Sequence, residues 1–404
     1  MKKSTYLRNK NFPIILCFAI GHAVMHFTAQ SFSVLLPYIQ KDFLITPVQV
    51  GLLITAKELV AGLVSLPGGI LSDYLARYRG QIMSMCFVLF GAGWLIVGAA
   101  QIYGVLFIGL AVVASASTVW HLPSLAELGS RFKENRGTVF AIHGAGGSIG
   151  DITGPVVTGL LLAFLSWREI ITVYVSLPLI LAIWTFLLFR GDLRKHKQEE
   201  QTKEHKTEKP NLKEQLLLSR DILKTTHIWR VNIVAGLRGM CFTVLITFLP
   251  IYMYDIGFSS KSIGFHFGLL WALGLFISPY FGHLSDKFGR KIVLVPALLY
   301  SSVLITALAL WGKGQFFTIL IVLLGFSIRS DYSLINATII DIVKNRVETT
   351  MLGILSLTRY LMGAIAPLIA GILYQYVGMQ ATFLFVSFLF LLAAIIFSSV
   401  NLNK

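Results

Sequence analysis

The sequence predicts an all-α polytopic membrane protein whose twelve transmembrane helices fall into two sets of six. Of its 404 residues, 55% are hydrophobic and only 13% are charged, about half the charged share of a soluble globular protein. The apolar residues form unbroken runs of about twenty or more, the length of a membrane-spanning helix, and lack the alternation of a membrane β-barrel. This composition excludes a soluble enzyme and a disordered chain.

Twelve spans are expected in order, near residues 12–36, 48–71, 80–101, 103–128, 137–162, 167–189, 228–254, 262–285, 291–312, 315–340, 347–373 and 379–400. The first apolar run, from Phe12, is too long for the core of a signal peptide and lacks a small-residue cleavage site. Between the sixth and seventh spans lies a segment dense in Lys and Glu. We therefore expect a six-helix bundle over 1–189, a cytoplasmic linker over 190–227 and a second bundle over 228–404.

The basic residues predict the orientation. With a cytoplasmic N-terminus, loops and tails on that side hold 25 of the 34 Lys and Arg, the opposite loops hold 4, and 5 lie inside or at the edges of spans. Such a bias marks the cytoplasmic side. Both termini are expected in the cytoplasm of a protein of the cytoplasmic (inner) membrane.

Several other classes of function find no support. The net charge of +15 sits in short loops, so no nucleic acid partner is expected. The cysteines Cys17, Cys86 and Cys241 lie inside apolar runs without metal-ligand spacing, and the glycines at 144–150 are not preceded by a strand as in a phosphate loop. The chain has no H-E-x-x-H cluster or serine nucleophile with a base, and its longest loop is the linker. No cofactor is expected, and an enzyme or non-transporting receptor is only a distant alternative.

Two loops, after the second and eighth spans, share one pattern. The later loop reads GHLSDKFGRK (282–291) and the earlier one reads GILSDYLARYR (69–79). In each, Asp follows Gly by four residues and Arg follows Asp by four, so that a carboxylate at a cytoplasmic helix end lies near basic residues and anionic lipid. We expect these loops to form a cytoplasmic gate that includes Asp73, Arg77, Arg79, Asp286, Lys287 and Arg290.

The pattern G-x-x-x-D-[RK]-x-G-[RK]-[RK] in these two loops resembles the major facilitator superfamily. The second copy matches in full, whereas the first has Tyr74 and Ala76 where a basic residue and a glycine are usual. The resemblance covers the whole chain. It implies two pseudo-symmetric six-helix bundles around a central cavity, a monomer, and transport by alternating access.

A second repeat is seen in the fifth and eleventh spans, which read GDITGPVVTG (150–159) and GAIAPLIAG (363–371). Small residues let helices pack closely and proline bends them. The first copy is similar to the G-x-x-x-G-P motif of proton-coupled drug exporters of this superfamily, which favours export.

Two further stretches resemble the fosmidomycin-resistance branch of the family. His26 is followed by Phe27, and Trp120-His121 precede a leucine and a proline. In that branch an acidic residue is often found where this chain has Gln30, so another group must carry a proton here.

Ionisable side chains inside spans cost about 2.5–3.5 kcal/mol each on insertion scales and are functional candidates. His22 and His26 share one helix face, for a cavity role or for helix packing, and without a third ligand no metal site is expected. Lys57 and Glu58 point about 100° apart on a helix, so we do not expect them to pair. Asp151 is expected to serve either as a structural link or as a proton carrier.

Arg329 and Asp331, two residues apart, are poorly placed to pair. At least one of Arg329 and Arg359 is therefore expected to meet a substrate or a carboxylate of another helix. A neutral to positive set of buried charges favours an anionic or zwitterionic solute.

We therefore expect a secondary active transporter of a small organic solute, with proton-coupled efflux; proton-coupled uptake of an organic acid or other nutrient is the alternative. The expected partners are the solute, a proton and membrane lipid. The expected substrate contacts are His22, His26, Gln30, Trp120, His121, Arg238, Arg329 and Arg359. The expected proton carriers are Glu58, Asp151, Asp331 and His26.

Overall fold

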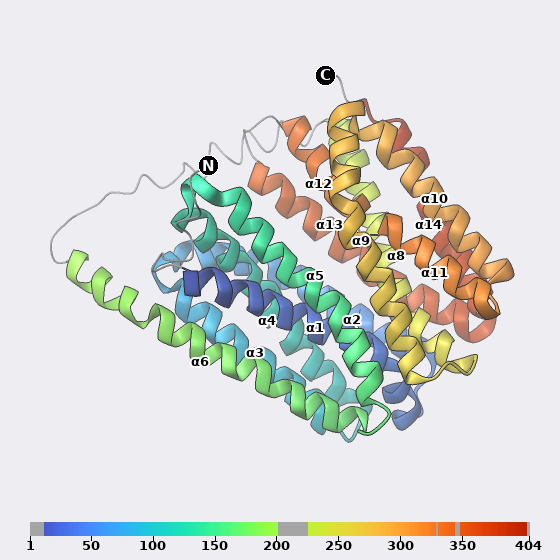
Figure 1. The fold of residues 1–404 in the computed structure, drawn as a ribbon, viewed down its shortest axis with the longest axis horizontal. Helices are drawn as coiled ribbons and strands as arrows, with labels where there is room; N and C mark the ends of the chain where they lie inside the picture. Colours follow the sequence, from blue (N-terminus) through green and yellow to red (C-terminus); the bar gives the residue numbers. More distant parts are fainter. Residues whose placement is uncertain (1–11, 201–224, 329, 344–347, 402–404) are drawn as a thin grey trace. The chain divides into compact units, whose positions relative to one another are not determined.

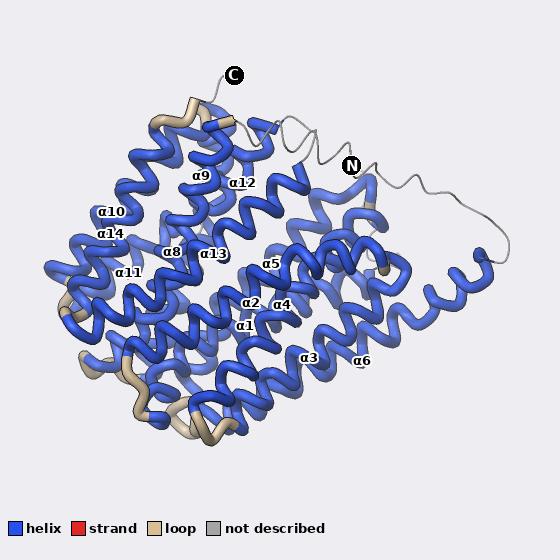
Figure 2. The backbone as a smooth tube through the Cα atoms, turned by 180° about the vertical axis from the view of Figure 1, so that it is seen from behind, coloured by secondary structure: helices blue, strands red, loops and turns tan. Residues whose placement is uncertain are grey.

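A computed structural model describes residues 12–200, 225–328, 330–343 and 348–401, and every regular element in these ranges is a helix (Figures 1 and 2). The long helices are α1 (Phe12–Phe43), α2 (Pro47–Tyr74), α3 (Arg79–Ala99), α4 (Tyr103–Arg131), α5 (Arg136–Leu161), α6 (Trp167–Glu200), α8 (Thr226–Asp255), α9 (Ser260–Phe288), α10 (Arg290–Trp311), α11 (Gly314–Ile328), α12 (Ser330–Val343), α13 (Glu348–Tyr376) and α14 (Met379–Ser398). Two short 3-10 helices, η2 (Ala76–Tyr78) and η3 (Lys133–Asn135), precede α3 and α5.

The fold class is confirmed. Eleven helical stretches in the described part of the chain are long and apolar enough to cross a membrane, with α11 and α12 counted together as Gly314–Val343. The helix α5 is not among these stretches because its glycines, hydroxyl residues, His143 and Asp151 lower its hydropathy. Its 26 residues still suffice to span a bilayer, and it is the twelfth helix of the set.

Most helix ends lie within a few residues of the predicted ones, and α6 differs most. It runs to Glu200, past the predicted end at 189, because Lys, Glu, Gln and Arg are good helix formers and do not stop a helix where the apolar run stops. The remainder of the linker, 201–224, lies outside the described residues.

Contacts between helices group the described chain into two units. The first unit holds the residues up to Leu35 and those from Leu63 to Glu200, and the second holds Leu36–Gly62 and the residues from Thr225 onward. The segment Leu36–Gly62 joins the second unit because α2 packs on α13, where the Thr55 hydroxyl donates to the Ala364 carbonyl at 2.6 Å. The division into bundles 1–189 and 228–404 stays a prediction.

Each unit is held together by close helix crossings. In the first unit α3 packs on α4 and α6, and an added Cβ at Gly93 would lie 2.9 Å from the carbonyl oxygen of Gly109. In the second unit α8 packs on α13, and α10 packs on α14. Crossings of this kind need small residues, because attraction between helices in lipid comes from close packing more than from exclusion of water.

Candidate functional site

Three glycines of α5 fix how α5 lies against α1. Added Cβ atoms at these positions would overlap α1 carbonyl groups in steps of one helical turn: Gly146 meets Ala19, Gly150 meets Ala23, and Gly154 meets Phe27. The two helices therefore run parallel in close contact. Residues of α1 and α5 that lie beside this line of contacts, including His22, His26 and Asp151, are brought face to face.

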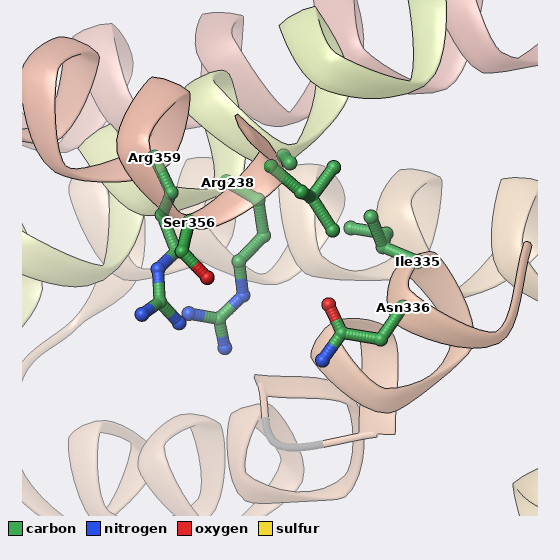
Figure 3. A pocket seen from close by; sticks show the side chains of 7 residues that line it. Arg238, Ile335, Asn336, Ser356 and Arg359 are labelled. Carbon is green, nitrogen blue, oxygen red and sulfur yellow. The ribbon is translucent and has the colours of Figure 1, made fainter. Parts of the chain in front are cut away.

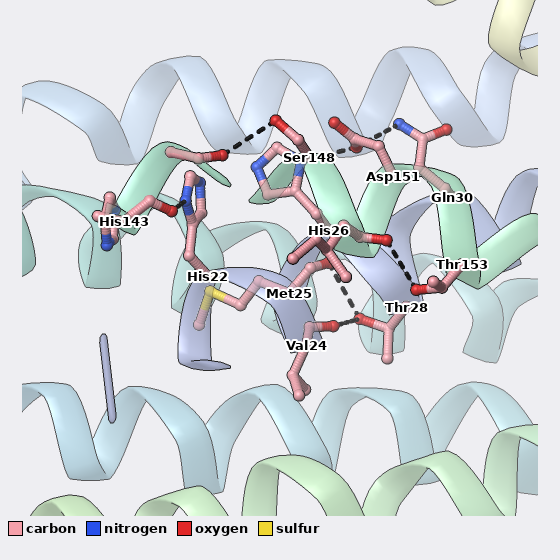
Figure 4. Close-up of polar contacts among 12 residues, drawn as sticks. His22, Val24, Met25, His26, Thr28, Gln30, His143, Ser148, Asp151 and Thr153 are labelled. Carbon is pink, nitrogen blue, oxygen red and sulfur yellow. Dashed lines mark hydrogen bonds and ion pairs between the residues drawn. The ribbon is translucent and has the colours of Figure 1, made fainter. Parts of the chain in front are cut away.

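A cluster of polar side chains results in the first unit (Figure 4). His26 Nδ1 lies 2.8 Å from Asp151 Oδ1, and the Gln30 side-chain amide donates to the same oxygen at 3.3 Å. His22 Nδ1 donates to the main-chain carbonyl of His143 at 2.8 Å. The Asp151 and Gln30 side chains are buried, whereas the His26 side chain is 35% exposed.

The helix α4 adds a third histidine to this cluster. His121 Nδ1 donates to the carbonyl of Ser117 in its own helix at 2.7 Å. Its ring centroid lies 5.2 Å from that of His22 and 6.1 Å from that of His26. Trp120 is fully buried, and its ring centroid lies 6.3 Å from that of His22 and 5.3 Å from that of His121.

The structure thus brings six sequence-predicted residues together: His22, His26, Gln30, Trp120, His121 and Asp151. It also places His143 there, with its ring stacked on His22 at 4.2 Å between centroids. His143 was not predicted as a site residue, although its four-residue spacing to Gly147 and Asp151 places it on their face of α5. The sequence analysis expected no metal site at His22 and His26 without a third ligand, and the structure places His121 of α4 beside them. This distance between helices cannot be read from the sequence.

The second unit holds a buried ion pair. Arg238 Nε of α8 lies 2.8 Å from Asp331 Oδ1 of α12, and the two side chains are 6% and 1% exposed. Arg238 also donates to the carbonyl of Ile328 and lies over the ring of Phe242. Asp331 thus meets an arginine, but one from another helix.

A pocket opens beside this pair, with an empty volume of about 230 Å³. Arg238 and Arg359 line it, and their guanidinium groups point into the same space from α8 and α13 (Figure 3). Asn336 of α12 and Ser356 of α13 contribute neutral polar groups. Asn336 was not predicted, because a neutral amide in a span carries no charge signal. Arg329, predicted as a substrate contact, lies outside the described residues.

The predicted absence of a contact between Lys57 and Glu58 is wrong. Lys57 Nζ lies 2.7 Å from Glu58 Oε1. Successive Cβ atoms do diverge on a helix, but the four-carbon lysine stem is long enough to bend around the helix surface. The carboxylate is 14% exposed, and Glu58 does not line the pocket.

The two gate loops differ in their contacts. In the second, Arg290 pairs with Asp286, donates to Asp341 at 2.8 Å and donates to the Ser285 hydroxyl at 2.6 Å. Lys287 lies over the adjacent ring of Phe288.

In the first loop, Arg79 reaches Glu127 of α4 at 3.8 Å, and Arg77 lies over the ring of Tyr78. The side chain of Asp73 lies outside the described part of the structure.

Comparison with known proteins gives consistent results. The sequence profile of the Major Facilitator Superfamily matches residues 18–282 and 233–400. A hexuronate transporter of Bacillus subtilis is 23% identical over 91% of this chain and 88% of its own. The fosmidomycin resistance protein of Escherichia coli is 21% identical over 99% of this chain and 96% of its own.

Among solved structures, a bacterial homolog of the human lysosomal transporter Spinster, in an inward-facing and unoccupied conformation, superposes with a TM-score of 0.78. It is 15% identical and covers 96% of this chain and 97% of that one. At this identity the likeness concerns the fold.

Proposed function

Because the chain belongs to the Major Facilitator Superfamily, a family of transporters and not of enzymes, we propose that it carries a small organic anion or zwitterion across the cytoplasmic membrane. Transport proceeds by alternating access and without a nucleotide. The protein is a monomer with both termini in the cytoplasm and with lipid around its spans.

The pocket with two arginines is the observation that supports this proposal. Guanidinium groups stay charged and bind carboxylates and phosphates through two hydrogen bonds. Arg238 and Arg359 both line the pocket, and Arg238 is paired with Asp331. The two guanidinium groups suit the acidic group of a solute, and the neutral polar groups of Asn336 and Ser356 lie beside them. The hexuronate named for the Bacillus relative is likewise the anion of an acid.

For the proton, we propose Glu58 as the first carrier. Asp331 is held by Arg238 in a buried pair, and Asp151 accepts from two side chains of α1. Glu58 is paired only with the flexible side chain of its own neighbour among the contacts described, so it can change its partner most easily. Asp151, Asp331 and His26 stay predictions from the sequence.

We favour efflux over uptake. The fifth-span motif that resembles proton-coupled exporters and the match to the fosmidomycin resistance protein support efflux. Uptake of an organic acid is the second candidate, and the match to the hexuronate transporter supports it.

The proposal can be tested with purified full-length protein and a panel of carboxylates, phosphates, amino acids and lipophilic cations. A ligand that binds only the folded state raises the melting temperature, and we expect anions or zwitterions to do so. Arg359→Ala should remove the shift and abolish transport while the protein still inserts. Arg230→Ala, on α8 but outside the pocket, is the matched control. Binding of lipophilic cations alone, or near-normal transport by Arg359→Ala, would contradict the proposal.

Direction and coupling need a separate measurement. Inverted vesicles with an imposed pH gradient should accumulate the solute if the protein exports it in exchange for protons. Glu58→Gln should transport at the rate seen without a gradient, whereas binding of the solute should persist. Accumulation only in right-side-out vesicles would show uptake, and unchanged gradient dependence of Glu58→Gln would remove Glu58 as the carrier.

A further inference from the structure

The three histidines of the first unit are arranged as ligands of one ion, and we infer that His22, His26 and His121 bind a divalent transition-metal ion of the Zn²⁺ class. One ring nitrogen of each lies within 4.8 Å of the others. Three imidazoles on one tetrahedral ion, with metal–nitrogen distances of about 2.0–2.1 Å, have ring centroids roughly 5 Å apart. Here the centroids are 4.4, 5.2 and 6.1 Å apart, so small rotations of the rings suffice to close the site.

The hydrogen bonds at Nδ1 prepare each ring for this role. A carbonyl oxygen only accepts, so the bonds to the His143 and Ser117 carbonyls place the ring proton of His22 and of His121 on Nδ1. The lone pair of each neutral ring is then on Nε2. His26 follows the same pattern with the carboxylate of Asp151 as acceptor. A metal-bound histidine typically donates its other ring N–H to a carboxylate or a carbonyl in this way, which fixes the tautomer and the ring orientation.

Residues around the three histidines hold the rings in this arrangement. Asp151 is buried, and the Gln30 amide donates to the oxygen that faces His26. An added Cβ at Gly147 would lie 2.7 Å from Cε1 of His22, so glycine leaves room for that ring in its present orientation. The ring of His22 stacks on that of His143 at 4.2 Å between centroids, and the ring of Trp120 lies 6.3 Å from His22 and 5.9 Å from His143. Packed rings with fixed tautomers lose little conformational freedom when they bind an ion.

Electrostatics favour a cation at this point. One ring nitrogen of each histidine lies within 4.8 Å of the others in a half-buried space, where a cation can accept a lone pair from all three rings. The exposed side of His26 provides access. Three nitrogen ligands select Zn²⁺, Co²⁺, Ni²⁺ or Cu²⁺ over Mg²⁺ and Ca²⁺, which prefer oxygen. The fourth position stays open for water or a ligand, as in three-histidine zinc sites.

The inference goes beyond the proposed transport function and does not depend on the solute. Its test uses full-length protein purified without a polyhistidine tag, with Zn²⁺ in equilibrium dialysis and Co²⁺ in visible absorption. We expect saturable binding of about one Zn²⁺ per chain, as for a single three-histidine site, with Mg²⁺ unable to compete. Co²⁺ should give the intense visible bands of a four-coordinate ion, which Zn²⁺ displaces.

His121→Ala should weaken Zn²⁺ binding at least about tenfold, the lower end of what the loss of a supporting contact does at metal sites. His283→Ala, an exposed histidine at the end of α9, is the matched control and should bind as the wild type does. Equal binding by a folded His121→Ala variant would overturn the inference, and so would the absence of saturable Zn²⁺ binding to the wild type. If His121→Ala does not fold, the Co²⁺ spectrum of the wild-type protein decides. A wild-type spectrum as weak as that of Co²⁺ in buffer alone would overturn the inference.

Discussion

The helix pair α1 and α5 of the first unit can be compared with α8 and α13 of the second through the prolines of α5 and α13. Eight residues before Pro155 stands Gly147, and eight residues before Pro367 stands Arg359. Four residues before the prolines, the two copies have Asp151 and Gly363. The order is therefore reversed: α5 has the glycine first and the large polar residue four positions later, whereas α13 has the large polar residue first and the glycine four positions later.

The partner helices compensate for this exchange. His22 of α1 fills the space beside Gly147, whereas on α8 it is Gly239 that leaves room for Arg359, with Arg359 Cγ 2.6 Å from an added Cβ. One turn further on, His26 faces Asp151, and Thr243 lies 3.3 Å from an added Cβ at Gly363.

At each helical turn, a close helix crossing has room for one large side chain, and either of the two helices can supply it. In the first unit this leads to neutral rings with nitrogen lone pairs. In the second it leads to a permanent positive charge. The repeated packing is therefore compatible with two different chemistries, a metal-ion site and an anion site, as we propose.

The largest expected difference concerns the two buried acids. Arg238→Ala should lower the free energy of unfolding by about 3–5 kcal/mol, because it leaves the charge of Asp331 buried without its arginine. His26→Ala should cost about 1–3 kcal/mol, since Asp151 loses one hydrogen bond and keeps that of Gln30. Chemical unfolding of both variants in detergent measures the difference.

The double variant Arg238→Met with Asp331→Leu is the control, because apolar replacement of a buried pair is often neutral. It should recover most of the stability that Arg238→Ala loses. Equal losses for Arg238→Ala and His26→Ala would break the contrast between a fixed ion pair and a hydrogen-bonded cluster.

An intermediate effect is expected from the two glycines of the crossings. Gly239→Ala should cost about 1–3 kcal/mol through overpacking, because its Cβ would lie 2.9 Å from the backbone oxygen of Arg359 as well as near its side chain. Gly147→Ala meets only the ring of His22, which can rotate, and should cost less. Thermal unfolding of the purified variants gives the ranking.

Glycines without a close neighbour provide the matched controls. Added Cβ atoms at Gly144 and Gly353 have no neighbour within 4 Å. Alanine at these positions should raise stability by roughly 0.5–1 kcal/mol, since glycine is unfavourable inside a helix. If Gly147→Ala proves more harmful than Gly239→Ala, the first-unit crossing is the more rigid of the two.

The smallest effect is expected at the gate loops. Arg290→Ala should change the initial transport rate of an anion found in the ligand screen by about two- to fivefold, because exposed ion pairs contribute at most about 1 kcal/mol. Arg77→Ala should change it by less, since the described contact of Arg77 is the ring of its neighbour. Initial rates in proteoliposomes compare them, and a larger effect of Arg77→Ala would reverse the order of the two loops.

Several features of the site were predictable because they depend on residues in one helix. The four-residue spacing of His22 and His26 places them on one face of α1, and their ring centroids lie 4.4 Å apart. The glycine run of α5 was correctly interpreted as close helix packing. In contrast, the contact of Lys57 with Glu58 was missed, because it depends on the path of a flexible side chain and not on the direction of its Cβ.

The sequence by itself determined the class of protein and the long apolar helices that cross the membrane, whereas the division at the charged linker stays a prediction. Membrane insertion depends on the length and polarity of each segment, and these are local properties. Only the tertiary structure decided that His121 of α4 joins the histidines of α1, and that Asp331 of α12 pairs with Arg238 of α8. Such contacts depend on the rotation and axial position of each helix against its neighbours. The sequence of one helix alone does not determine these quantities.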